Sequence, residues 1–205
     1  MYYFLGSSVT YGSNNNASSF VNEIASLLNC YTEKEAISGT TLANNGATSY
    51  VARLMNNLNK QEKVESLIVQ LSTNDVSQNK PLGTITNSKN IESFDNTTVL
   101  GAIEFIIAYA KMTWDCDVIF YTNPNYNNAA YVNLINKLYE IQTKWNIGII
   151  DFYNYADMEA LDSATLSSYM SDAIHPNAKG YAWMGQVFAN YLQKEFAKKH
   201  NNVLI

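Results

Sequence analysis

The sequence predicts an α/β fold, a three-layer α/β/α sandwich in which a parallel sheet of about five strands lies between two layers of helices. Short apolar runs rich in β-branched and aromatic residues alternate with longer stretches whose apolar residues recur every three or four positions. This alternation is typical of parallel strands whose connecting helices cover both faces of a sheet. The chain has 205 residues and no interrupting linker, so residues 1–205 are expected to form a single domain.

The strands are expected at the short apolar runs. These fall at residues 2–5, about 31–37, 65–72, 117–122 and 147–152. Helical spacing predicts the intervening helices over about 20–28, 51–58, 99–110 and 134–145, and a last helix that begins near Ala178. In flavodoxin-like order, the strands would present their carboxyl ends at the edge where open α/β folds bind ligands.

Three polar segments are candidates for a functional role. Two Asn-rich stretches, at 13–19 and 123–128, each follow a predicted strand and therefore fall at the ligand-binding edge. Residues 76–96 have little periodicity and are rich in Asn, Ser, Thr and Gly, which predicts a long loop over one edge of the sheet. Long loops in compact domains often serve function, so this loop is expected to influence which ligands fit.

Composition excludes several kinds of partner. Lys and Arg total 13 against 18 for Asp and Glu, a formal net charge of −5 without a basic block, so no nucleic-acid partner is expected. The longest apolar runs, such as "AIEFIIAYA" at 102–110, are too short for a membrane span. The chain opens on a strand-like run without a basic segment or a small-residue cleavage site, which predicts a cytoplasmic location.

The two cysteines, Cys30 and Cys116, lie beside predicted buried strands. This placement favours core thiols in a reducing compartment over a disulfide. Neither cysteine has a histidine or a second cysteine at the close spacing that zinc requires, so no metal is expected.

One histidine stands in a context suited to catalysis. Of the two histidines, His200 lies in the polar tail "KKHNN" and is expected to be exposed to solvent. His175 lies in "SDAIHPNAKGY", with Asp172 three residues before it and Pro176 directly after it, and the proline disfavours helical angles at His175. A carboxylate so placed can bind one ring nitrogen and leave the other to act as a base. Taken alone, the pattern also fits a turn at the entry of a helix.

Hydroxyl groups are crowded after the first predicted strand, in "GSSVTYG" at residues 6–12. A base and its orienting carboxylate become useful when a serine lies within hydrogen-bond reach. One of these hydroxyls is therefore the expected nucleophile, and Ser7 and Ser8 are the alternatives.

Four segments together resemble the sequence blocks of the SGNH hydrolases, also called the GDSL esterase family. They read "FLGSSVTYG", "AISGTT", "QLSTNDVS" and "SDAIHPNAKGY", occur in the family's order and span nearly the whole chain. The resemblance implies the SGNH hydrolase fold. It also implies that Ser8 is the nucleophile, His175 the general base and Asp172 its orienter. In the family's pattern, Ser8, Gly39 and Asn74 would form the oxyanion hole.

Two positions depart from the family pattern. Ser7 stands where the family usually has Asp, so a weaker acceptor replaces a structural carboxylate, and Ser72 stands where the family commonly has Gly. Ser8 is preferred as the nucleophile because its spacing to Thr10 and Gly12 matches the family's first block. Neither departure removes a catalytic group.

The implied function is that of a serine esterase that hydrolyses small, acetyl-type or carbohydrate-linked acyl esters through an acyl-enzyme intermediate, with neither a metal nor an organic cofactor. Asn125 and Tyr126 are candidate substrate-binding residues, with a solvated loop as the competing interpretation. The same residues would suit an acyltransferase to a sugar hydroxyl. A non-catalytic carbohydrate-binding protein and a flavin-phosphate site in the hydroxyl-rich loop are further alternatives. The sequence does not predict the oligomeric state.

Overall fold

A computed structural model describes the backbone of residues 1–201 and the side chains of residues 1–199. Within these residues, five strands form one parallel sheet in the order β2-β1-β3-β4-β5. The strands are β1 (Tyr2–Gly6), β2 (Thr32–Ala36), β3 (Ser66–Gln70), β4 (Asp117–Tyr121) and β5 (Gly148–Ile150). This order confirms the predicted flavodoxin-like sheet. The side chain of His200, for which the sequence predicts exposure, lies outside the described residues.

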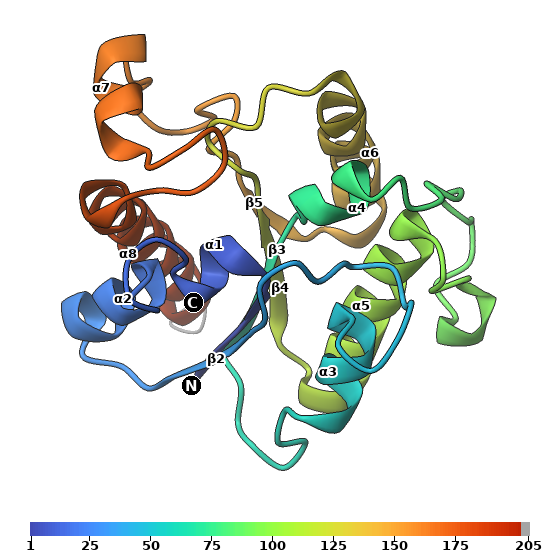
Figure 1. The fold of residues 1–205 in the computed structure, drawn as a ribbon. Helices are drawn as coiled ribbons and strands as arrows, with labels where there is room; N and C mark the ends of the chain where they lie inside the picture. Colours follow the sequence, from blue (N-terminus) through green and yellow to red (C-terminus); the bar gives the residue numbers. More distant parts are fainter. Residues whose placement is uncertain (202–205) are drawn as a thin grey trace.

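Helices cover both faces of the sheet, with α2 and α8 on one face and α3, α5 and α6 on the other (Figure 1). None of the described helices combines the length and the apolar character needed to cross a bilayer. In chain order the helices are α1 (Ser8–Tyr11), α2 (Phe20–Leu28), α3 (Tyr50–Asn56), α4 (Thr73–Ser77), α5 (Val99–Trp114), α6 (Ala129–Trp145), α7 (Ser163–Tyr169) and α8 (Ala178–Asn201).

Each face of the sheet has its own apolar core, as the alternation of side chains along a strand requires. In β1, Tyr3 and Leu5 join the core under α3, α5 and α6, whereas Phe4 joins the core under α2 and α8. Every residue of β1 and β3 is buried, which is typical of central parallel strands. The edge strand β2 reads "TEKEA" and is only partly buried, and its charges discourage pairing with another chain.

Three short helices, α1, α4 and α7, do not stand out in the sequence because they span too few residues for helical periodicity to show. Two of them begin at the ends of central strands. α1 starts at Ser8, two residues after β1 ends, and α4 starts at Thr73, three residues after β3 ends. The predicted nucleophile and the predicted oxyanion-hole asparagine therefore both lie in the first turn of a short helix.

The expected loop at 76–96 is irregular for most of its length, apart from the end of α4 and a 3-10 turn at Ile91–Ser93. Its middle packs onto α5 and α6. The fully buried carboxylate of Glu104 accepts a hydrogen bond from Thr86 N at 3.0 Å and pairs with Lys144, whose ammonium also donates to Thr86 O at 2.7 Å. This buried ion pair fixes the middle of the loop against the two helices.

Candidate active site

The structure brings Ser8 and His175 together at the carboxyl end of the sheet, although 167 positions separate them in the sequence. Ser8 Oγ lies 2.9 Å from His175 Nε2. The serine follows β1 and is 8% exposed, and the histidine approaches from the turn before α8. A buried hydroxyl and an imidazole in this contact can exchange a proton.

Asp172 binds the other nitrogen of the same ring. His175 Nδ1 lies 2.8 Å from Asp172 Oδ2 and 3.0 Å from Oδ1. Asp172 Oδ1 also accepts hydrogen bonds from the backbone N–H groups of Ile174 and His175, each at 2.8 Å. The carboxylate therefore closes the turn that presents the imidazole. The predicted Asp172 and His175 pair is assembled in the structure.

The pKa of Asp172 is lowered to about 2. Partial burial opposes ionisation, but the backbone N–H of His175, the His175 ring and the backbone N–H of Ile174 outweigh it. A carboxylate with this pKa carries a full negative charge at neutral pH. It can hold the Nδ1 proton of the ring, so that Nε2 accepts the proton of Ser8.

The geometry distinguishes Ser7 from Ser8. Ser7 is fully buried and its backbone N–H donates to Gln70 Oε1 at 2.9 Å. Among the described residues, Ser7 Oγ has no hydrogen-bond partner; it lies near the hydroxyl of Tyr50 without a well-aligned bond to it. Ser8 is the serine that faces the imidazole.

Gly39 and Asn74 lie on adjoining segments that meet at Thr40. The Asn74 side-chain amide donates to Thr40 O at 3.0 Å, and Gln78 Nε2 donates to Gly39 O at 2.8 Å. Gly39 has a φ of +80°, and nothing lies within 4 Å of where a Cβ would be, so the space beside it is open. An amide has two N–H groups, and the Thr40 bond uses only one of those of Asn74.

Ser72, one of the two departures from the expected block pattern, has a structural role in this chain. Its hydroxyl accepts a hydrogen bond from Asn74 N at 3.1 Å and donates to Thr40 O at 3.3 Å. It is the N-cap of α4. The serine therefore orients the turn that carries Asn74.

Two buried charged residues, Arg53 and Asp75, hold the Gly39 segment in place. Arg53 is 1% exposed and donates to Gly6 O at 2.8 Å and to Thr40 Oγ1 at 3.0 Å. Asp75 is equally buried, which raises its pKa, and accepts the N–H groups of Leu42 and Ala43 at 2.8 and 3.0 Å. The sequence does carry one signal, because Arg53 is the chain's single arginine and interrupts an apolar helical stripe.

Asn125 and Tyr126 lie in a loop that borders the histidine turn. Asn123 links the two segments: its side chain donates to Ile174 O at 2.9 Å and accepts the backbone N–H of Asn125 at 3.0 Å. Tyr126 is half-buried against the ring of Tyr131, with centroids 5.2 Å apart. Among the described residues, no hydrogen bond joins Asn125 or Tyr126 to Ser8 or His175. A role of these two residues in substrate binding therefore stays a prediction.

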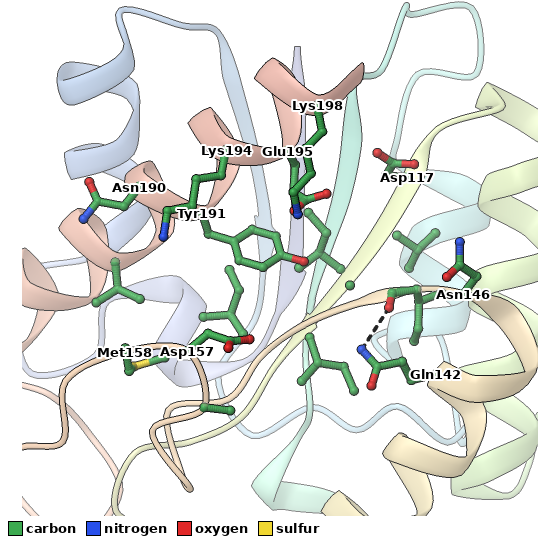
Figure 2. A pocket seen from close by; sticks show the side chains of 18 of the residues that line it. Asp117, Gln142, Asn146, Asp157, Met158, Asn190, Tyr191, Lys194, Glu195 and Lys198 are labelled. Carbon is green, nitrogen blue, oxygen red and sulfur yellow. Dashed lines mark hydrogen bonds and ion pairs between the residues drawn. The ribbon is translucent and has the colours of Figure 1, made fainter. Parts of the chain in front are cut away.

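A groove of about 940 Å³ lies elsewhere, along the edge strand β5. Figure 2 shows Tyr191, Lys194 and Glu195 of α8 on one side of it and Gln142 and Asn146 at the end of α6 on the other. None of the predicted site residues lines this groove. In the described part of the chain, no group of three or more His, Cys, Asp or Glu side chains is arranged to hold a metal ion.

Comparisons with known proteins identify the family of the chain and agree with its fold. The model of the GDSL-like lipase/acylhydrolase family matches residues 4–183. Among solved structures, a protein from Lactobacillus plantarum is 18% identical, with a TM-score of 0.73 over 97% of this chain and 96% of that one. A lipase from a goat rumen metagenome is 16% identical, with a TM-score of 0.62 over 91% and 94%.

A family two carbohydrate esterase from Clostridium thermocellum, solved in complex with cellohexaose, is also similar. It is 15% identical, with a TM-score of 0.64 over 98% of this chain and 64% of that one. At such identities these structures show a shared fold. The search of curated proteins gave no match.

Proposed function

Because this chain belongs to the GDSL-like lipase/acylhydrolase family, we propose that it is a serine esterase that hydrolyses small acetyl-type acyl esters, including esters on carbohydrates. The observation that carries the proposal is the 2.9 Å contact between Ser8 Oγ and His175 Nε2, with Asp172 bound to the other ring nitrogen. A serine, a base and an orienting carboxylate in this geometry are suited to acyl transfer.

In the proposed reaction, Ser8 Oγ attacks the ester carbonyl carbon while its proton passes to His175 Nε2. Asp172 holds the Nδ1 proton and stabilises the imidazolium that forms. The tetrahedral intermediate then expels the alcohol, which takes the proton from Nε2, and leaves an acyl group on Ser8. Water, activated by the same imidazole, attacks that acyl group and releases the acid. The cycle regenerates the Ser8 hydroxyl and the neutral ring.

The negative charge on the carbonyl oxygen needs donors that are already in place. We assign this role to the backbone N–H groups of Ser8 and Gly39 and to the N–H of Asn74 that the Thr40 bond does not use. The open space at Gly39 and the fixed Asn74 side chain support the assignment. Donors held by the fold need no reorganisation as the charge develops, which makes them effective.

Replacing Asn74 with alanine should lower kcat by about a hundredfold to a thousandfold, because one oxyanion donor is lost. KM should change much less, since the donor acts mainly on the charge of the transition state. Steady-state kinetics with a short-chain p-nitrophenyl ester would measure both constants. A loss of less than about threefold in kcat would remove Asn74 from the oxyanion hole.

The pH dependence should show a single ionisation on its acid side. Since the pKa of Asp172 is about 2, Asp172 is already ionised above about pH 4, and the imidazole is the remaining group that has to lose a proton before it can act as the base. Log kcat/KM should therefore rise with a slope of about one between about pH 4.5 and 6. A slope of two over that range would contradict the ionised Asp172.

The lowered pKa of Asp172 also contributes to the stability of the folded protein. Asp172 has a lower pKa when folded than its ordinary 3.8, so its charge favours the folded state at pH values above about 4. That contribution is lost as the pH falls through about 2.

The proposal is tested by treating the protein with a fluorophosphonate, measuring the intact mass and mapping the modified peptide. The same preparation is assayed with p-nitrophenyl acetate. We expect a single adduct on Ser8 together with turnover of the acetyl ester. Folded protein that gives neither adduct nor turnover would contradict the esterase proposal. Acetylated oligosaccharides would then show whether sugar-linked esters are preferred, as the likeness to a carbohydrate esterase suggests.

A further inference from the structure

The carboxylate of Asp172 is held by one side chain from outside its own turn. Asn14 Nδ2 donates to Asp172 Oδ2 at 3.0 Å, and this oxygen also lies 2.8 Å from His175 Nδ1. The other donors to the carboxylate, at Ile174 and His175, belong to the same turn. Within the described residues, the bond from Asn14 is therefore the only direct hydrogen bond that joins the segment following Ser8 to this carboxylate.

Asn14 lies in a tight turn that starts directly after α1. Gly12 has a φ of +96°, and a Cβ there would lie 2.7 Å from the backbone of Ala17 and Ser18, so only glycine lets the chain fold back so closely. Asn14 itself has a φ of +65°, a left-handed conformation that asparagine adopts more readily than most residues. The chain therefore leaves the helical path of α1 before it reaches Asn14.

Hydrogen bonds from β2 and α8 hold this turn at both ends and in its middle. Lys34 Nζ donates to Tyr11 O at 3.0 Å and to Ala17 O at 2.7 Å. The hydroxyl of Tyr181, on α8, donates to Ser13 O at 3.1 Å. A turn held by two other elements of the fold can fix the position of a side chain that it carries.

Ser13, the residue before Asn14, contacts the segment that carries Gly39. Ser13 Oγ lies 3.0 Å from Ser38 Oγ, and Ser38 directly precedes Gly39. Two consecutive side chains therefore contact the two segments that flank Ser8. One is the glycine segment and the other is the turn of Asp172 and His175.

We propose that Asn14 is a positioning residue that fixes the Asp172 carboxylate relative to Ser8 and so aligns the His175 ring for proton transfer. The inference rests on the proposed esterase function. Asp172 is 46% exposed, so water competes for its oxygens. Without Asn14, Asp172 Oδ2 keeps only the His175 ring as a hydrogen-bond partner among the described residues, so the carboxylate holds the orientation of the ring less firmly.

The first test compares Asn14→Gly with Asn16→Gly. Both positions have a positive φ and lie in the same turn, and among the described residues the Asn16 side chain makes no hydrogen bond. Glycine keeps the backbone conformation at each position. Asn14→Gly should lower kcat about three- to tenfold with KM nearly unchanged, as loss of one solvent-accessible hydrogen bond allows. Asn16→Gly should behave like the wild type, and an equal kcat for the two variants would overturn the positioning role.

The second test does not depend on turnover. The chain has only two histidines, so NMR can follow the titration of the His175 ring, with a His200→Gln variant for assignment. Asp172 is in direct contact with this ring, and Tyr181 is a further titratable group that interacts with Asp172. Asn14→Asp adds a negative charge beside Asp172 and should raise the titration midpoint by about one pH unit, whereas Asn16→Asp should leave it nearly unchanged.

The two tests separate this inference from the proposed function. Equal midpoints for Asn14→Asp and Asn16→Asp would overturn the contact between Asn14 and Asp172, whether or not the protein hydrolyses esters. If the wild type neither reacts with the fluorophosphonate nor turns over the ester, the esterase proposal fails while the NMR comparison still decides the contact. A raised midpoint together with a lowered kcat for the Asn14 variants would support both.

Discussion

Replacing Ser8 with alanine should lower kcat by about 10⁴-fold or more, and should abolish labelling by the fluorophosphonate. The physical reason is that, among the described residues, Ser8 Oγ is the hydroxyl in contact with the imidazole, at 2.9 Å, which makes it the proposed nucleophile. The fold should be retained, since the change removes one hydroxyl at a site that is 8% exposed. Circular dichroism and a thermal melt would check this.

The matched control is the neighbouring serine. Among the described residues Ser7 Oγ has no well-aligned hydrogen bond, although it lies near the hydroxyl of Tyr50, so Ser7→Ala removes a buried polar atom that the fold stabilises little. We expect kcat within about threefold of the wild type and unchanged or slightly higher stability. Loss of activity in Ser7→Ala with activity retained in Ser8→Ala would reverse the assignment of the nucleophile.

The elements that could be predicted from the sequence are those whose signal is local. Central strands such as Ser66–Gln70 are continuous apolar runs because both faces are covered, and long helices such as Ala129–Trp145 repeat their apolar residues over several turns. The spacing of Asp172 and His175 is also local, since both lie in one turn. The resemblance to the family, which the family match confirms, predicted that Ser8, Gly39 and Asn74 belong to one site.

The parts that could not be predicted depend on contacts between distant segments. Asn14 is one of three consecutive asparagines, and only the fold shows which of them reaches a residue 158 positions away. The same holds for Asp75, which looks like a turn residue but accepts two backbone N–H groups from residues 42 and 43. Local sequence cannot specify such pairs, because hydrogen bonding between them is a result of tertiary packing.

The exchange of aspartate for serine at position 7 shows the same limit. Gln70 Oε1 accepts from the backbone N–H groups of Ser7 and Thr10 and from the Thr10 hydroxyl, so a neutral amide satisfies these donors beside Ser8, the proposed nucleophile. Gln70 lies on β3, 63 positions after Ser7 and 60 positions after Thr10 in the sequence. The sequence shows that the carboxylate is missing, and the structure shows which residue accepts the nearby N–H groups instead.

Arg53 is the residue whose loss should affect the fold around the site most strongly. Its guanidinium joins three segments: it donates to Gly6 O at the end of β1, to Glu35 O at 2.7 Å in β2, and to Thr40 Oγ1 beside Gly39. Nε donates to Thr48 O at 2.9 Å, and the second bond of Nη1 is an ion pair with Glu35 at 3.2 Å. These contacts use all five N–H groups that an arginine has.

We expect Arg53→Met to lower the free energy of unfolding by about 3 kcal/mol or more, because it leaves a partly buried carboxylate and several buried acceptors without their donor. For a domain of this size, that corresponds to a Tm lower by about 6 °C or more. Arg53→Lys should recover only part of the loss, since a lysine has three donors in a different geometry. Urea denaturation would measure each change.

The control for Arg53→Met is Lys137→Met, which removes the positive partner of an exposed ion pair with Glu140 and should cost less than about 1 kcal/mol. Below the melting temperature, folded Arg53→Met protein should also have a lower kcat than the wild type. The reason is that the hydrogen bonds of Arg53 no longer join the Gly39 segment to β1. A loss of stability no greater than that of Lys137→Met would mean that the five hydrogen bonds do not hold the site together. A large loss of stability with full kcat would instead confine the role of Arg53 to folding.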